Sequence, residues 1–245
     1  MGIVTLEVCS FSFDGCLSAE LGGGNRIELC ANSMEGGTTP SYGLIKKVRE
    51  EISLKLYPLI RPRGGDFYYS DDEFEIMLDD IRLCRNIGCD GIATGIQRAD
   101  GDIDFDRMKR IVDLAYPMRV TCIRVFDLIH DMFGALDGLV DAGCERVLTS
   151  GQAQKAYEAA ETIAQLVKYA GDRIVIMPGS GIRPDNIEML VKTTHASEYH
   201  ASARTFIPSA VSENHPLLKE FGQAIDCDAV QLKMIKELAE AAFSV

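Results

Sequence analysis

The chain has 245 residues, of which 47% are hydrophobic, so it is long enough to bury a substantial core. Its net charge of -12 disfavours a nucleic-acid-binding protein or a binder of anionic membranes, and no apolar run is long enough to span a bilayer. Because the first residues lack the basic start and the apolar core of a secretory signal, the eight cysteines are expected to be reduced thiols in the cytoplasm.

Short strand-like runs alternate with amphipathic helical patterns along the chain. Eight such units in a chain of this length favour a closed ring of parallel strands over an open sheet. The sequence therefore predicts an α/β fold, a single (β/α)8 TIM barrel over residues 1–245, with a long loop at 204–227 after the last barrel strand. The predicted strands cover residues 4–9, 26–30, 55–61, 91–95, 119–126, 146–150, 174–177 and 198–203.

The first two predicted strands carry acidic and thiol side chains at alternating positions. Apolar residues alternate with Thr5, Glu7 and Cys9 in the first strand, and with Glu28 and Cys30 in the second. Because successive strand residues face opposite sides, these polar residues are expected inside the barrel. A pair of thiolates there would suit Cu(I), although a single cysteine is more often a small buried hydrophobe. The chain has no CxxC or HExxH motif and four histidines, so no zinc site of ordinary spacing is visible.

The segment 60–67, after the third predicted strand, holds two arginines, two glycines and a carboxylate. Arg61 and Arg63 share one side of the strand while its geometry persists, and the glycines allow a turn that brings Asp66 to the same space. Forked cations at a strand end suit a carboxylate or a phosphate. The alternative is a surface network of arginine and aspartate around a turn.

A third arginine, Arg124, is expected near the end of the fifth predicted strand. With Arg61 and Arg63 it would lie beside the carboxylates of Glu7 and Glu28 at the barrel mouth. Such a set of opposite charges could be a functional site or a structural network of compensated ions.

A glycine turn at 179–181 precedes a predicted helix, and free amides at a helix N-terminus can bind an anion. In barrels the loops after strands 7 and 8 commonly form a phosphate site, although a turn of this kind is more often ordinary turn chemistry. His200 is the histidine best placed for proton transfer, since it lies in the last predicted strand near Ser202. The predicted anion-binding residues are Arg61, Arg63, Ser150, Gly179, Gly181 and Ser202.

Six segments together resemble the CutC copper homeostasis protein family. They are EVC at 7–9, RIELC at 26–30, EGGTTPS at 35–41, IRPRGGDF at 60–67, LTSG at 148–151 and EYHASA at 198–203. The resemblance implies a (β/α)8 barrel, a cytoplasmic location and a role in copper handling, with Cys9 and Cys30 at the positions of the family's suspected copper ligands. One position departs from the family pattern, because this chain has Ile123 where members usually carry a histidine. If that histidine is essential, Cys122 or His200 would have to replace it.

Two functions from different classes follow from these residues, and a scaffold or oligomeric interaction protein is a third possibility. The first is a cytoplasmic protein of copper homeostasis that binds Cu(I) through Cys9 and Cys30. The second is a barrel enzyme acting on a small phosphorylated or carboxylated substrate held by Arg61, Arg63 and Arg124. The expected partners are a metal ion or a small anionic ligand and, in a homo-oligomer, further copies of the chain, with no nucleic acid and no membrane. In the enzyme the catalytic residues would be Glu7, Glu28, Asp66, Arg124 and His200.

Overall fold

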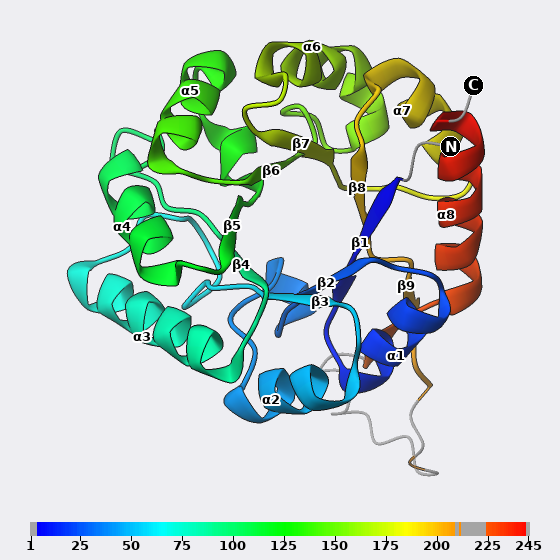
Figure 1. Cartoon of the computed structure of the whole chain (residues 1–245), viewed down its shortest axis with the longest axis horizontal. Coiled ribbons are helices and arrows are strands. Elements are labelled where there is room, and N and C mark those ends of the chain that lie inside the picture. The colour runs from blue at the N-terminus through cyan, green and yellow to red at the C-terminus, as the bar shows by residue number, and fades with distance from the viewer. Residues whose placement is uncertain (1–3, 209–210, 212–223, 244–245) are drawn as a thin grey trace.

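The computed structural model describes residues 4–208, 211 and 224–243. Eight parallel strands form a ring in the centre, and helices surround it (Figure 1). This arrangement confirms the predicted α/β barrel of parallel strands. The strands are β1 (Thr5–Ser10), β2 (Arg26–Leu29), β3 (Lys55–Pro58), β4 (Gly91–Thr94), β5 (Arg119–Cys122), β6 (Arg146–Thr149), β7 (Val175–Pro178) and β8 (Glu198–Ala201).

Two four-stranded parallel sheets make up the ring. One sheet has the strand order β3-β2-β1-β8, and the other has the order β4-β5-β6-β7. Isolated parallel bridges join them, from Leu59 to Ala93 between β3 and β4 and from Gly179 to His200 between β7 and β8. The strands therefore follow one another around the ring in chain order (Figure 1).

The helices bury one face each against the strands. In α3, the residues Phe74, Met77, Leu78 and Ile81 are buried, at the spacing of three and four that places side chains on one face of a helix. No helix in the described part of the chain is long and apolar enough to cross a membrane. The helices are α1 (Phe13–Leu21), α2 (Tyr42–Glu51), α3 (Asp71–Ile87), α4 (Phe105–Ala115), α5 (Met132–Ala142), α6 (Ala160–Ala170), α7 (Ile187–Thr194) and α8 (Ala229–Phe243).

The predicted fifth strand, 119–126, is too long. β5 ends at Cys122, and a short 3-10 helix follows it. The last ladder bond runs from the Ile123 amide to the Thr94 carbonyl at 2.9 Å, and the Phe126 amide then bonds back to Ile123 at 3.2 Å. The apolar pattern continues past the strand because the turn also buries its hydrophobic side chains. The 3-10 helices are η1 (Ser33–Glu35), η2 (Arg124–Leu128) and η3 (Ala156–Ala159).

The predicted loop at 204–227 begins and ends in short strands. Its first strand, β9 (Arg204–Phe206), pairs antiparallel with its last, β10 (Ile225–Cys227). β10 in turn lies against α1. Residues 209–210 and 212–223 of the predicted loop lie outside the described residues.

Candidate functional site

Three neighbouring strands, β8, β1 and β2, bring acidic, thiol and imidazole groups together inside the barrel. In the strand register Glu7 is aligned with both Arg26 and His200, and Cys9 is aligned with Glu28. These residues alternate along their strands with fully buried apolar residues that pack on the outer side. Residues that are far apart in the sequence therefore meet at two successive inward levels of the barrel.

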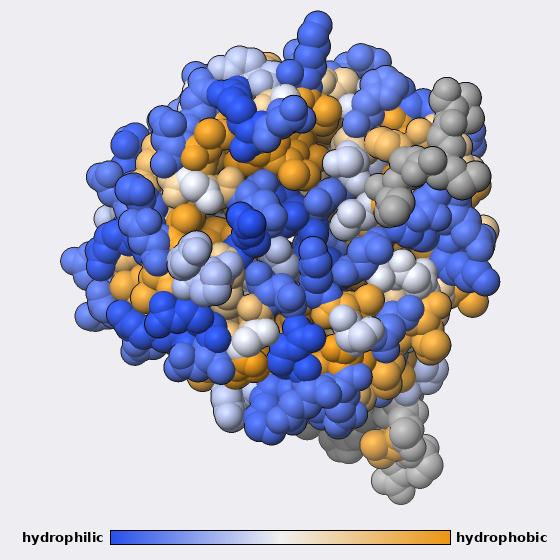
Figure 2. Space-filling model, in the orientation of Figure 1, coloured by the Kyte–Doolittle hydropathy of each residue, from blue (hydrophilic) through white to orange (hydrophobic). Residues whose placement is uncertain are grey.

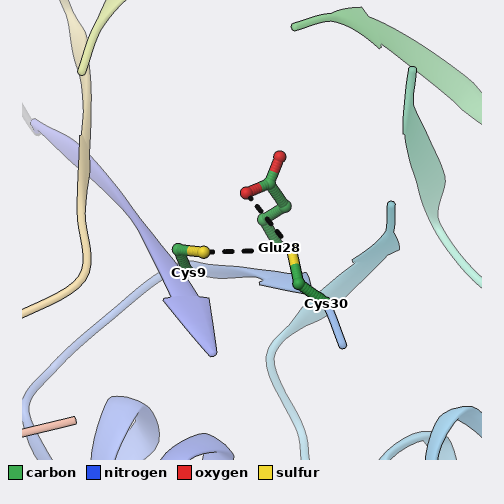
Figure 3. A group of neighbouring side chains, drawn as sticks. All are labelled: Cys9, Glu28 and Cys30. Carbon is green, nitrogen blue, oxygen red and sulfur yellow. Dashed lines mark hydrogen bonds between the residues drawn. The ribbon is translucent and has the colours of Figure 1, made fainter. Parts of the chain in front are cut away.

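The two thiols predicted as a pair lie next to each other at the mouth (Figure 3). The Sγ atoms of Cys9 on β1 and Cys30 just after β2 are 3.9 Å apart. The Cys30 thiol donates to Oε2 of Glu28 at 3.6 Å. Cys9 is partly exposed, whereas Glu28 and Cys30 are buried. One donor atom from each of the three lies within 4.8 Å of the others, which is close enough to hold one metal ion.

His200 on the neighbouring strand β8 lies beside these three residues. We call Cys9, Glu28, Cys30 and His200 together the thiol cluster. Its Nδ1 lies 2.8 Å from Oε1 of Glu7, and its Nε2 lies 3.8 Å from Oε2 of Glu28. Because Nδ1 is engaged with Glu7, Nε2 is the ring nitrogen that remains for a ligand. The imidazole therefore connects a buried carboxylate on one side with the thiol pair on the other.

The two thiols differ in protonation. Hydrogen bonding to Cys30 lowers the pKa of Cys9 to about 5, and His200 adds to this effect while burial opposes it. Burial raises the pKa of Cys30 well above its ordinary value, and the neighbouring Cys9 raises it further. Near neutral pH Cys9 is therefore a thiolate, and Cys30 is a thiol that donates to its neighbours.

The carboxyl groups of Glu7 and Glu28 also differ in pKa. Burial would raise the pKa of Glu7, but Arg26 and then His200 overcome burial and lower it to about 2. Burial raises the pKa of Glu28 well above its ordinary value, the Cys9 charge adds to this, and His200 opposes it. Burial would lower the pKa of His200, but hydrogen bonds with Cys9 and Glu7 raise it. The pKa of Glu7 is thus lowered and that of Glu28 raised, on either side of an imidazole whose own pKa is raised.

A network of buried ions lies deeper in the barrel, at the first residues of three strands. Arg26 of β2 forms ion pairs with Glu7 and, through Nη2 at 2.5 Å, with Glu198 of β8. Arg146 of β6 approaches the same Glu198 carboxylate at 2.6 Å. Both guanidiniums lie over the ring of Tyr57, at 5.1 and 5.6 Å from its centre. Hydrophilic residues also cover the centre of the barrel end seen in Figure 2.

The predicted partnership of the inward glutamates with Arg61, Arg63 and Arg124 is wrong. The cation that pairs with Glu7 is Arg26, which is buried at the start of β2, and the neighbour of Glu28 is His200. Arg26 occupies the inward position two residues before Glu28, so the same alternation could have identified it. The three predicted arginines stabilise loops around the mouth instead, and each has its own set of partners.

Arg61 is buried and holds two loops together. Its Nη1 donates to the carbonyls of Glu35 and Gly37 at 2.7 and 2.6 Å, and its Nη2 donates to Gly65 at 2.7 Å. The guanidinium also lies 4.9 Å from the ring centre of Phe67. These contacts use the terminal nitrogens that an anion would need, so Arg61 as an anion ligand stays a prediction that its contacts do not favour.

Arg63 and Asp66 form the surface network that the sequence left open as an alternative. Arg63 donates to Glu73 at 2.6 Å, to Asp66 at 3.1 Å and to the carbonyl of Tyr68 at 2.7 Å. The Asp66 side chain is 68% exposed, and its partners are Arg63 and the amide of Tyr68. None of these partners belongs to the thiol cluster, so a catalytic role for Asp66 stays a prediction.

Arg124 and Ser150 meet around the buried carboxylate of Asp127. Asp127 in η2 accepts hydrogen bonds from the Thr149 hydroxyl at 2.5 Å and from the amide and hydroxyl of Ser150 at 3.0 and 2.9 Å. Arg124 donates to Asp127 and to Ser150, both at 2.8 Å. This arrangement fastens the turn after β5 to the loop after β6.

The glycine turn after β7 does not lead directly into a helix, because α7 begins only at Ile187. The Gly179 amide is already bonded to the Thr149 carbonyl at 2.9 Å. Gly181 has a φ of 75°, which favours glycine, and it lines a cavity of about 330 Å³ that also includes Lys155 and Arg183. Anion binding by Gly179, Gly181 and the half-buried Ser202 stays a prediction.

The imidazole in the cluster comes from β8 rather than from β5. Ile123 is buried among apolar residues after β5, and the Cys122 thiol donates to a backbone carbonyl at 3.7 Å. Of the two replacements considered for the family's histidine, His200 lies with the thiol pair. The departure at position 123 therefore leaves the thiol cluster with a histidine of its own.

Comparisons with known proteins agree on one family. The family model of the CutC family matches residues 4–205. A family protein CutC from Chromobacterium violaceum is 47% identical over 206 residues, which are 84% of this chain and 83% of that protein. One from Parabacteroides distasonis is 46% identical and covers 86% of this chain and 89% of its own length. The solved structure of CutC from Streptococcus agalactiae, which is named for copper homeostasis, has a TM-score of 0.77, 31% identity and coverage of 81% and 98%.

Proposed function

Because this chain belongs to the CutC family, we propose that it serves copper homeostasis in the cytoplasm by binding Cu(I) through Cys9 and Cys30. The single observation that carries the proposal is the 3.9 Å separation of the two Sγ atoms at the barrel mouth. One ion between the sulfurs could contact both without a large movement of either strand. The role is that of a carrier, so no bond of a substrate has to be broken.

The donor chemistry of the site fits Cu(I). Thiolates are soft ligands that select Cu(I) over harder ions. Cys9 is a thiolate near neutral pH and is partly exposed, so an ion arriving from solvent meets it first. All eight cysteines are free thiols, which supports a reducing compartment such as the cytoplasm.

Cu(I) titration tests this proposal directly. The Cys9→Ala/Cys30→Ala variant is expected to bind Cu(I) about 100-fold more weakly than the native protein, because it loses both soft ligands. The measurement is an anaerobic competition with a chromophoric Cu(I) chelator. The Cys84→Ala/Cys89→Ala variant is the matched control, since it also removes two buried thiols, and its affinity should equal that of the native protein. Equal binding by the Cys9/Cys30 variant would reject the ligand assignment.

Acid–base catalysis on a small phosphorylated or carboxylated compound is a second candidate function. The observation in its favour is that the pKa values of Glu7 and Glu28, on either side of His200, are shifted in opposite directions. Environments that push the pKa values of two carboxyl groups apart are typical of acid and base pairs in enzymes. The arginines predicted to hold the substrate are already bonded to the protein, which is why this function ranks second.

Inorganic phosphate is the probe for this second function. If the mouth holds an anion, adding phosphate should shift the amide resonances of Gly181 and Ser202 in a saturable way, because both follow the last two barrel strands. Amides of α3, on the far side of the ring from this loop pair, serve as the internal control. Linear shifts spread over the whole chain would count against an anion site.

A further inference from the structure

A cavity of about 330 Å³ lies between the loops that connect β6 with α6 and β7 with α7. The two helices are neighbours in the ring (Figure 1). The cavity is separate from the thiol cluster, because no residue of that cluster lines it. Its lining residues are Lys155, Tyr157, Gly181, Arg183, Asp185 and Asn186.

Hydrogen bonds between the two loops hold the walls of this cavity in place. The carbonyl of Ser180 accepts from the Ala156 amide at 3.0 Å, and the Ser180 hydroxyl donates to the carbonyl of Gln154 at 2.7 Å. The two loops are therefore fixed to each other before any ligand enters, which lowers the entropic cost of binding one.

The wall that follows β7 is fixed by one side chain and opened by a glycine. The Asn186 side chain donates to the Gly181 carbonyl at 2.9 Å and accepts from the Arg183 amide at 3.0 Å. A Cβ atom at Gly181 would lie 2.6 Å from Cδ of Lys155. Because glycine has no such atom, the aliphatic part of Lys155 can lie against this wall.

Two cations in the lining have no carboxylate partner. Within the described part of the chain neither Lys155 nor Arg183 forms an ion pair, although the protein has a net charge of -12. Another loop arginine, Arg124 after β5, shows the more usual arrangement, since it pairs with Asp127 at 2.8 Å. Asp185 is the single carboxylate among the lining residues, so the cavity has one positive charge in excess.

We propose that this cavity binds the phosphate group of a small phosphorylated compound. The Arg183 guanidinium can donate two parallel hydrogen bonds to phosphate oxygens, and the Lys155 ammonium adds a compact positive charge. Two cations attract a doubly charged phosphate more strongly than a singly charged carboxylate. The cavity is at the lower end of the range of about 300–1,000 Å³ for ligand pockets, so it suits a small compound.

This site goes beyond the two functions proposed above and depends on neither. Copper binding uses Cys9 and Cys30, which lie outside the cavity. The anion of the second candidate function is expected to affect the amides of both Gly181 and Ser202, but Ser202 does not line this cavity. The response of Ser202 therefore distinguishes the two anion sites.

A phosphate titration at constant ionic strength tests the inference, with amide resonances as the readout. We expect inorganic phosphate to shift Gly181 and Arg183 in a saturable way. The Lys155→Ala/Arg183→Ala variant should bind phosphate at least about tenfold more weakly, because both charged donors are lost. Asp185→Asn should bind it about threefold more tightly, because the lining loses its negative charge.

The Lys109→Ala/Arg110→Ala variant is the matched control. It also removes two exposed cations, but on α4, where Lys109 pairs with Asp113 and Arg110 with Glu75. Its phosphate affinity should equal that of the native protein. Acetate, titrated into the native protein in the same way, should bind at least about fivefold more weakly than phosphate, since it carries a single charge.

The outcomes separate this site from its alternatives. Absence of saturable phosphate binding, or native affinity in a folded Lys155→Ala/Arg183→Ala variant, would overturn the site. If Ser202 still shifted saturably in that variant, the anion site of the second candidate function would stand without this one. Equal affinities for acetate and phosphate would reject a phosphorylated ligand. Weaker binding by the double variant and tighter binding by Asp185→Asn, with Ser202 unshifted, would support the site proposed here and count against the other.

Discussion

Glu198→Ala is expected to destabilise the protein by about 3–5 kcal/mol, because it leaves buried guanidiniums without their shared carboxylate. Glu198 accepts from Arg26 at 2.5 Å and from Arg146 at 2.6 Å, and both arginines are buried. Their positive charges would then lie together in the barrel with fewer compensating groups, since the pKa of Arg26 is too high for it to lose its proton. Urea unfolding followed by circular dichroism measures the change.

Glu188→Gln provides the matched control for this prediction. Glu188 also forms an ion pair, with Lys192 at 2.6 Å, but both side chains are more than half exposed on α7. Exposed pairs of this kind contribute little, so the unfolding midpoint should not change. A loss below about 1 kcal/mol for Glu198→Ala would mean that the two arginines find water or other acceptors. Their buried charges would then not depend on pairing with Glu198.

Asp127→Ala is expected to cost about 2–4 kcal/mol, because one buried carboxylate satisfies several donors at once. The donors are the Thr149 hydroxyl, the amide and hydroxyl of Ser150, and the Arg124 guanidinium. Without the carboxylate, the Thr149 hydroxyl and the Ser150 amide lose their acceptor in a region that water hardly reaches. The same urea unfolding experiment gives the change in free energy.

Asp66→Ala is the comparison for this second prediction. Asp66 also pairs with an arginine and accepts an amide hydrogen bond, but on an exposed turn. We expect it to cost less than about 1 kcal/mol, because water replaces the lost acceptor. If the two aspartate variants lost equal stability, burial of Asp127 could not be the reason for its effect.

The spacing of hydrophobic residues predicted the fold, because that spacing reflects which side chains are buried. Each of the eight predicted strands overlaps an observed one, since a strand covered by helices must be apolar at every second position or more. The C-terminal ends of the strands were less predictable. The fifth predicted strand continues past Cys122, where the strand gives way to a 3-10 turn but the side chains remain buried. The third continues past Pro58, where the amides of Leu59 and Ile60 still bond to the neighbouring strands outside the regular β3. The hydrophobic pattern shows which side chains are buried, but it does not show where the hydrogen bonds between strands end.

The site was predicted in part, for a similar reason. Alternation gives the direction of a side chain, and it placed Cys9, Cys30 and Glu28 correctly inside the barrel. It does not give the partner, which depends on the register between strands. Arg26 meets Glu7 because β1 and β2 are offset so that these two residues align, and no single-strand pattern contains that offset. Long arginine side chains near strand ends can also turn back to loop carbonyls, as Arg61 does.

The way the ring closes divides it into two halves. Single bridges at Leu59–Ala93 and Gly179–His200 are the seams between two half-barrels. All four donors of the thiol cluster belong to the half built from β8, β1, β2 and β3, whereas the contact between Glu198 and Arg146 ties that half to the other. The halves are therefore joined along the seams by fewer backbone pairs than neighbouring strands share within each half, and the four side chains of the cluster come from strands on one side of both seams.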